Sequence, residues 1–447
     1  MSTSSRSLIP GPKSRQWANR LRRVESRNVT YQSNQFPVFW ASAQGAWVKD
    51  VDGQRFLDLT SAFAVASLGH SPQILRQAIR KQSQAMWHGM GDIHPNAIKV
   101  LLLESLAELA PGALSVSILS NSGAEAVESA LKTARLATGR PGILVFEGGY
   151  HGLTYGTLGA TDRKEFTAPF ADQLARHFVH APFPDSLRGP TEDFCLEFVE
   201  GFFRKGGKTP AGLVGALLIE PIQGRGGVRI PPPSFLNGLR QIAQRYGVLF
   251  IADEIFTGFG RTGRDFAVDH SGVSPDLMCL GKALTNGFPL SVCVVTPAVM
   301  RAWPASDGEA IHTSTFLGNP LGCAMALASL SEFQKKRLSR RAADLGLWWK
   351  NELLTALGDH PCVGEIRSAG LMLGIELVKD KRGLIPDRML ASQIVTQALQ
   401  NHLILLSGGI HRNVITLTPP LTISKQELTR GTEILKKIFY GKTRTKN

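Results

Sequence analysis

Short apolar runs alternate with segments of helical periodicity through the middle of the chain. Residues 248–252 and 277–280 are apolar runs closed by polar or glycine residues, as in strands that are buried on both faces of a parallel sheet. Residues 212–254 read as strand, loop, helix and strand, an order typical of parallel strands joined by right-handed crossovers. The pattern therefore predicts an α/β fold with a mostly parallel sheet.

The two ends of the chain have other patterns. Residues 1–12 are rich in Ser, Pro and Gly and predict a flexible tail, which a basic helix follows at about 16–25. Residues 37–72 read as short strands with a turn at Asp52-Gly53. After residue 332 come a long basic helix, strand-like segments, a helix near 391–402 and a final helix. This order predicts a smaller α+β unit.

Composition adds limits to this picture. A chain of 447 residues that is 43% hydrophobic and 19% charged can bury a substantial core and form one large and one smaller domain. Its formal charge of +14 would suit anionic substrates or nucleic acid. The basic residues gather near the two ends, however, and no nucleic-acid module appears. We therefore expect solvated basic faces and no nucleic-acid partner.

The cysteines and the apolar runs indicate a cytoplasmic protein. Five cysteines are scattered without CxxC spacing, which favours buried thiols over a metal site or a disulfide framework. No run has the length of a signal-peptide core or of a membrane span. We expect no membrane partner and no metal.

Two strand ends carry the candidate chemistry. Asp253 closes the first apolar run, and Lys282 follows the second after Gly281. A lysine amine can form a Schiff base with an aldehyde cofactor, and a carboxylate facing a pyridinium nitrogen keeps that nitrogen protonated. Pyridoxal phosphate needs both groups. The alternative is that Asp253 caps a turn and Lys282 is a solvated surface lysine.

Two further turns follow predicted strands. Ser122, Gly123 and Ala124 open a predicted helix over about 124–138, and the amino end of a helix suits a phosphate group. An everyday helix N-cap is the alternative. Tyr150 and His151 lie just beyond the next apolar run, where an aromatic ring can stack on a pyridine ring.

The strings DEIFTGFGRTG and LGKALTNGFPL closely resemble the class III pyridoxal-phosphate-dependent aminotransferases, the family of 4-aminobutyrate, ornithine and acetylornithine aminotransferases. The resemblance runs from about residue 37 to the final helix. It implies fold-type I, with a mostly parallel seven-stranded sheet in a large domain, a smaller α+β domain, and a homodimer. It also implies four units: an extension at 1–36, the N-terminal part of the small domain at 37–75, the large cofactor-binding domain at 76–331, and the C-terminal small domain at 332–447.

The resemblance also assigns roles to residues. Lys282 would hold the cofactor and move the proton, and Asp253 would face the ring nitrogen. The other cofactor contacts that it implies are Ser122, Gly123, Ala124, Tyr150, His151, Glu220, Ile255, and, toward the neighbouring subunit's phosphate, Thr315 with Ser314. Phe63 would line the substrate pocket. From the pattern alone, Phe63 reads as core and Glu220 as a carboxylate that stabilises a turn.

Three positions depart from the family pattern. Arg225 stands where 4-aminobutyrate and ornithine aminotransferases carry a glutamate, and Thr416 stands where they carry the arginine that pairs with it. Phe256 replaces a glutamine. Without the glutamate–arginine pair, the switch between two substrate types is lost. We hypothesise that Arg225 supplies a fixed cation for a substrate carboxylate. A solvated loop arginine is the alternative.

The resemblance implies an aminotransferase with ping-pong kinetics. It would move an amino group from an amino acid, by family default an ω-amino acid such as 4-aminobutyrate, to a 2-oxo acid such as 2-oxoglutarate or pyruvate. A racemase or epimerase and an aminomutase on the same fold remain alternatives. A catalytically idle cofactor-binding protein is a further alternative from a different class.

Overall fold

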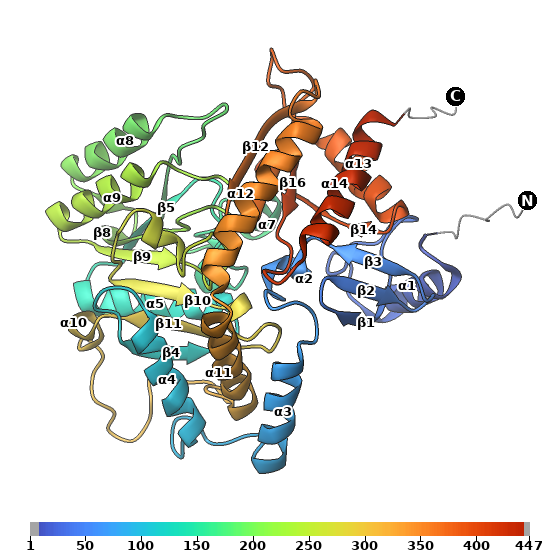
Figure 1. Cartoon of the computed structure of the whole chain (residues 1–447). Coiled ribbons are helices and arrows are strands. Elements are labelled where there is room, and N and C mark those ends of the chain that lie inside the picture. The colour runs from blue at the N-terminus through green and yellow to red at the C-terminus, as the bar shows by residue number, and fades with distance from the viewer. Residues whose placement is uncertain (1–8, 442–447) are drawn as a thin grey trace, which may run out of the picture.

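The computed structural model describes residues 9–441. A large sheet with its helices occupies one side of the molecule, and a smaller unit occupies the other (Figure 1). The blue N-terminal and red C-terminal segments lie side by side in the smaller unit, where β14 (Leu403–Ile404) pairs in parallel with β3 (Arg55–Asp58). The smaller unit is therefore built from both ends of the chain.

The central sheet is mostly parallel. In spatial order its path runs β4 (Val116–Ser120), β11 (Ser291–Val295), β10 (Leu277–Leu280), β9 (Leu249–Asp253), β8 (Gly212–Ile219), β5 (Gly142–Phe146) and β6 (Phe178–Ala181). Only β11 runs antiparallel to its neighbours on this path. A two-residue strand, β7 (Lys208–Thr209), pairs with β8 off the path. The predicted fold class, with seven strands in sequence across a mostly parallel sheet, is confirmed.

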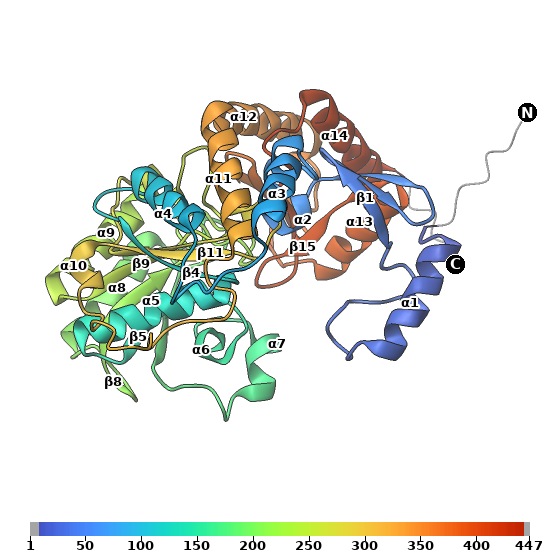
Figure 2. The ribbon, with the colours of Figure 1, turned by 90° about the horizontal axis from the view of Figure 1, so that it is seen from below.

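Both faces of the sheet are covered by helices. Along β9, Phe250 and Ala252 face one core while Ile251 faces the other, because successive strand residues point to opposite faces. The helix α5 (Gly123–Thr138) packs on the Ile251 side, and α4 (Ala97–Leu109) and α11 (Pro320–Lys335) pack on the opposite side (Figure 2). On that opposite side lie also α8 (Glu192–Arg204) and α9 (Pro233–Tyr246). Burial on both faces explains why the strands read as continuous apolar runs.

The smaller unit has two four-stranded sheets. The first joins β1 (Trp40–Gln44), β2 (Trp47–Asp50), β3 and β14. The second joins β12 (Val363–Ala369), β13 (Met372–Leu377), β16 (Val414–Leu417) and β15 (Leu406–Gly408). Its helices are α12 (Leu338–Leu357), α13 (Arg388–Gln400) and α14 (Lys425–Tyr440), and α3 (Gln73–Ala85) packs on α11 of the large unit.

The predicted flexible tail is wrong where it can be compared. Residues 1–8 lie outside the described residues, but Ile9 is buried against Phe56 and Leu399, and its carbonyl accepts a hydrogen bond of 2.7 Å from Gln400 Nε2. The basic helix α1 (Pro12–Val24) begins earlier than predicted. One apolar side chain, too isolated to form a pattern, is enough to anchor this segment.

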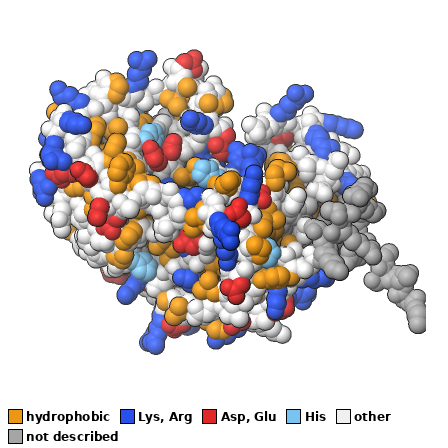
Figure 3. All heavy atoms as spheres, turned by 90° about the horizontal axis from the view of Figure 1, so that it is seen from above, with side chains coloured by type: hydrophobic (Ala, Val, Ile, Leu, Met, Phe, Trp, Pro, Cys, Tyr) orange, Lys and Arg blue, Asp and Glu red, His pale blue; other side chains and the backbone are white. Residues whose placement is uncertain are grey.

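The surface and the buried thiols fit the composition. On the face seen in Figure 3, basic side chains are interspersed with acidic and apolar ones. The five cysteines are free, and four of them are buried. In residues 9–441, no helix is long and apolar enough to cross a membrane, and no cluster of His, Cys, Asp and Glu side chains could hold a metal ion.

Candidate active site

The strand ends of the central sheet surround a cavity of about 580 Å³. Glu220 follows β8, Asp253 ends β9, and Lys282 follows β10, so three titratable groups reach one edge of the sheet. Parallel strands present their carboxyl ends at the same edge, where ligands bind in open α/β folds. The predicted residues that line the cavity are Phe63, Gly123, Ala124, Tyr150, His151, Glu220, Arg225, Asp253, Ile255, Lys282 and Thr416, with Phe256.

Asp253 is held in a fixed orientation. Its Oδ2 lies 2.7 Å from His151 Nδ1, and its Oδ1 accepts a 3.1 Å hydrogen bond from the Ile255 N–H. Because a carboxylate only accepts, His151 Nδ1 carries the proton. Both side chains are buried. The arrangement aims an oriented carboxylate into the cavity with His151 as its support.

Lys282 combines an unusual backbone with a perturbed amine. Its φ of 41° lies in the left-handed region, which non-glycine residues occupy only when the surroundings enforce it. Its Nζ lies 4.8 Å from the centroid of the Phe256 ring. Burial lowers the pKa of the ammonium, against the raising effect of the Asp253 and Glu220 charges. A lower pKa makes the neutral amine, the form that reacts with an aldehyde, more available.

Glu220 ties two turns together. Its carboxylate accepts hydrogen bonds from the Tyr150 N–H at 2.9 Å and from the Gly224 N–H at 3.1 Å. The side chain is buried, and burial raises its pKa to about 7 in spite of His151, which lowers it. These contacts match the interpretation of Glu220 as a turn-stabilising carboxylate, and the side chain also lines the cavity.

The raised pKa of Glu220 predicts a pH dependence of stability. The folded state keeps its proton up to about pH 7, whereas the unfolded chain loses it near pH 4.3. The free energy of unfolding should therefore fall as pH rises between these values, by at most about 3 kcal/mol from this group. Glu220→Gln should remove that part of the fall. Denaturant titrations of both proteins from pH 5 to pH 8 measure it, and equal slopes would contradict the prediction.

The start of α5 forms a recess without side chains. Ser122 caps the helix by accepting a 3.3 Å hydrogen bond from the Glu125 N–H. A Cβ on Gly123 would meet Ile255 Cδ1 at 3.0 Å, and one on Gly152 would meet Ala124 Cβ at 2.6 Å. The amino end of α5 is thus kept free of bulk beside the cavity. Its first N–H groups and the helix dipole suit a phosphate, so the recess fits that part of pyridoxal phosphate.

Phe63 projects from a left-handed turn. Ser61, Ala62, Phe63 and Ala64 all have φ between 40° and 66°. The Ser61 hydroxyl donates to the Thr418 carbonyl at 2.6 Å, which helps to hold this unfavourable conformation. Phe63 is 59% exposed in the single chain and lines the cavity. Its interpretation as a core residue is wrong.

Arg225 lies on aromatic rings at the cavity wall. Its Cζ is 4.6 Å from the Tyr150 ring centroid and 5.5 Å from that of Phe166. No carboxylate in residues 9–441 forms an ion pair with it. Thr416, on β16, lines the same cavity. An arginine that rests on two rings in a cavity differs from a loop arginine surrounded by solvent.

Ser122, Ser314 and Thr315 are the predicted site residues that do not line this cavity. Ser314 Oγ accepts a 3.1 Å hydrogen bond from Asn121 Nδ2, beside the cap of α5. Thr315 is exposed on the chain surface. Within one chain, the structure therefore brings Ser314 near the α5 recess but leaves Thr315 outside the cavity.

The sequence analysis missed several lining residues, chiefly Leu153, Arg163, Leu406, Ser407, Gly408 and Thr418. Thr418 lies two positions beyond Thr416, a spacing that could have suggested a shared face. Arg163 had no such signal, because its segment shows neither helical nor strand periodicity.

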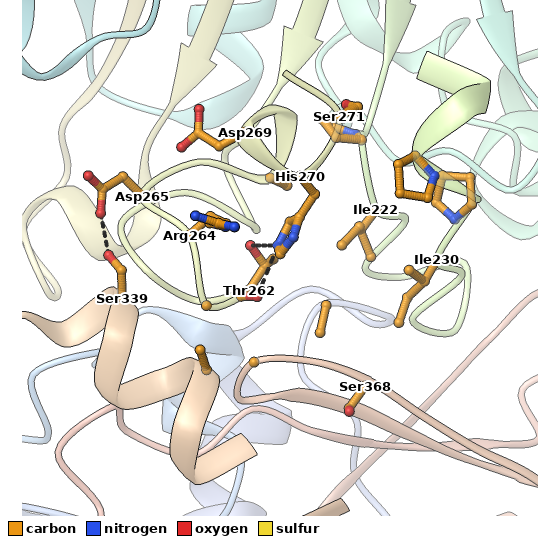
Figure 4. A pocket seen from close by; sticks show the side chains of 18 of the residues that line it. Ile222, Ile230, Thr262, Arg264, Asp265, Asp269, His270, Ser271, Ser339 and Ser368 are labelled. Carbon is orange, nitrogen blue, oxygen red and sulfur yellow. Dashed lines mark hydrogen bonds between the residues drawn. The ribbon is translucent and has the colours of Figure 1, made fainter. Parts of the chain in front are cut away.

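A second cavity is larger, at about 960 Å³. It lies between the 262–271 loop, α12 and the turn from β12 to β13 (Figure 4). Its polar side chains satisfy one another: Ser339 hydrogen-bonds Asp265, and His270 Nε2 lies 3.1 Å from Thr262 Oγ1. None of the strand-end groups lines it. The candidate chemistry thus belongs to the smaller cavity.

Comparison with known proteins agrees with this chemistry. The profile of the family described as Aminotransferase class-III matches residues 29–439. The 4-aminobutyrate aminotransferase of Mycobacterium leprae is 36% identical over 438 residues, which cover 96% of each chain. A Bacillus anthracis aminotransferase of known structure has a TM-score of 0.89 at 29% identity, covering 98% of this chain and 99% of its own. An amine transaminase from an uncultivated Pseudomonas species, solved in the PLP-bound form, has a TM-score of 0.85 at 29% identity, covering 93% of this chain and 98% of its own.

Proposed function

Because the chain belongs to the class III aminotransferases, which depend on pyridoxal phosphate, we propose that it transfers an amino group from an ω-amino acid to a 2-oxo acid. The observation that carries this is one cavity containing Lys282, Asp253 and the recess at the start of α5. The ω-amino donor comes from the similarity to a 4-aminobutyrate aminotransferase. The relatives are transaminases, so a racemase, an epimerase or an aminomutase is not favoured.

The residues present fit the cofactor. Gly123 and Ala124 with the Ser122 cap would take the phosphate, Tyr150 and Ile255 would pack on the ring, and Asp253 would hold a proton on the ring nitrogen. His151 and Glu220 would position Asp253 and Tyr150. When bound, pyridoxal phosphate supplies an aldehyde for the amino group and a ring that delocalises the negative charge of the deprotonated substrate carbon.

Lys282 would then carry out the proton transfer. Its Nζ takes the proton from the substrate carbon and returns it within the same closed cavity, a general-base role that a lysine with a lowered pKa suits. Burial among Phe256, Ile255 and Tyr150 limits the access of water to that proton. The amino group leaves the donor in one half-reaction and joins the acceptor in the next.

Arg225 would bind a carboxylate of the substrate. Replacing Arg225 with alanine removes a charge-assisted hydrogen bond, so KM for carboxylate substrates should rise by about 10- to 100-fold. Steady-state kinetics with an ω-amino acid and with benzylamine, which lacks a carboxylate, measure the effect and control for it. Arg225→Lys should recover part of the loss, because lysine keeps the charge but not the planar fork. Unchanged KM values for both carboxylate substrates would contradict this role.

A homodimer would complete the site. Several large apolar side chains near the Ser314–Thr315 segment are exposed in the single chain, among them Trp87, Ile93, Ile311 and Phe316, and Phe63 is exposed as well. Such exposure favours burial against a second copy, in which Thr315 would reach the phosphate bound to the partner subunit. Sedimentation velocity tests the assembly; an active monomer would contradict it.

We also place the division between domains as the sequence predicts it. The small domain would comprise 37–75 and 332–447, the large domain 76–331, and the extension 1–36. The pairing of β14 with β3 supports joining the two small-domain parts. Limited proteolysis, with cuts near residues 36, 75 and 332, tests these bounds.

The five free cysteines support a place in the reducing cytoplasm. Fractionation of cells that produce the protein tests it, and recovery from an oxidising compartment would contradict it.

The visible spectrum of the cofactor-loaded protein tests the function. Amines are added one at a time without an oxo acid. Loss of the bound-aldehyde absorption identifies a donor, and its return on adding an oxo acid identifies an acceptor. A protein that takes up the cofactor but keeps its absorption with every amine, or a protein that takes up no cofactor, would overturn the proposal.

A further inference from the structure

The main chain of Arg225 is fixed from both units of the molecule. Its carbonyl oxygen accepts a 3.0 Å hydrogen bond from Arg163 Nη1 and a 3.1 Å hydrogen bond from the Gly409 N–H. Arg163 belongs to the large unit and Gly409 to the small one. With its guanidinium on Tyr150 and Phe166, Arg225 is restrained at both ends of its side chain.

Arg163 is itself held in place. Its Nε and Nη2 both donate to Glu165 Oε1, at 3.0 Å and 2.8 Å, and only 7% of Arg163 is exposed. Glu165 Oε1 also lies 3.2 Å from Arg412 Nη2, on the turn between β15 and β16. Although partial burial raises it, hydrogen bonds from its own backbone N–H and from Arg163 bring the pKa of Glu165 down to about 2. This bridge of Arg163, Glu165 and Arg412 therefore stays charged at ordinary pH and links the two units.

Arg225 has no place to retreat to. A cation that releases one substrate and moves aside for another needs an anionic partner in its second position. No carboxylate in the described part of the chain pairs with Arg225, because Glu165 is already shared by two other arginines. The cation at the cavity wall has one position.

We propose that this fixed cation binds the distal carboxylate of both substrates in turn, so that donor and acceptor must carry it at the same distance from the reacting carbon. The proposal rests on the proposed function, in which both substrates react in one cavity against Lys282. The transfer needs no outside oxidant: the donor carbon loses its amino group and one hydrogen and becomes a carbonyl, and the acceptor carbon makes the reverse change.

The substrate class follows from this geometry. An ω-amino acid and a dicarboxylic 2-oxo acid match when the same number of methylene groups separates the reacting carbon from the distal carboxylate. β-Alanine thus matches oxaloacetate, 4-aminobutyrate matches 2-oxoglutarate, and 5-aminovalerate matches 2-oxoadipate. Pyruvate has no distal carboxylate and should be a poor acceptor.

Two series of half-reactions test the match. The cofactor-loaded protein receives the three ω-amino acids separately, and the aminated protein then receives the three oxo acids and pyruvate, with the absorption followed in each case. One matched pair should be at least about tenfold better in kcat/KM than the other members of both series. Optima at different lengths, or pyruvate as the best acceptor, would overturn the inference while leaving the aminotransferase intact. If no amine changes the absorption, both proposals fall.

A second experiment tests the bridge as a positioning device. Glu165→Gln removes its charge and should let Arg225 move, so the preference between chain lengths should shrink by about fivefold with a larger effect on KM than on kcat. Glutarate, which cannot react, should bind about fivefold more weakly by calorimetry. Glu197→Gln, an exposed glutamate on α8, is the matched control.

Arg412→Gln provides a milder change, because Arg412 is on the surface and forms only the outer half of the bridge. It should weaken glutarate binding in the same direction with an unchanged melting temperature. Wild-type glutarate affinity and wild-type chain-length preference in both bridge variants would overturn the positioning role.

Discussion

Lys282→Ala is expected to lower kcat by roughly 10⁴-fold or more. The loss has two causes, since the variant lacks both the amine that reacts with the cofactor aldehyde and the base that moves the proton of the substrate carbon. No other lysine lines the cavity, so no neighbour can replace it. Single-turnover absorption measurements on cofactor-loaded protein separate these steps from substrate binding.

The fold of the Lys282 variant should remain intact. Alanine meets the same left-handed backbone at φ 41° as lysine does, and no hydrogen bond of the Lys282 side chain needs replacing. A melting temperature near that of the wild type would show this, and Lys379→Ala, on the loop after β13, serves as control. Transamination within tenfold of the wild-type rate would refute the role assigned to Lys282.

The strand-end chemistry could be predicted because it is local in sequence. Asp253 and Lys282 follow apolar runs directly, and an apolar run closed by a polar residue is the mark of a buried parallel strand. Adjacent strands in the sheet then bring the two residues together without further information. The phosphate recess is local in the same sense, because Ser122 caps the helix that Gly123 begins.

The wall of the cavity could not be predicted in this way. Arg163, Arg225 and Gly409 meet through two hydrogen bonds, although they come from segments separated by dozens of positions. The left-handed turn at Phe63 is held by Thr418, which is equally remote in sequence. Side-chain hydrogen bonds between irregular segments have no periodicity, so they emerge only once the two units are assembled.

Asp253→Asn is expected to lower kcat by roughly 10³-fold while the protein still folds and takes up the cofactor. Asparagine keeps the shape of the side chain and can still accept a hydrogen bond from His151 through its amide oxygen. It removes the charge that stabilises a proton on the facing ring nitrogen. With that nitrogen neutral, the ring withdraws electrons less strongly, and proton removal from the substrate carbon becomes slow. A primary kinetic isotope effect with deuterated donor should therefore grow in the variant.

The neighbouring carboxylate separates this charge effect from a general loss of buried charge. Glu254 is buried like Asp253, but its carboxylate accepts from the Thr257 hydroxyl and from the Val268 N–H, away from the cavity. Burial raises the pKa of Glu254 to about 7. Glu254→Gln should change stability with pH yet leave kcat within about threefold, because it removes no charge that faces the substrate. If both variants lose activity equally, the effect of Asp253 is structural, and the proton on the ring nitrogen must be held by another group.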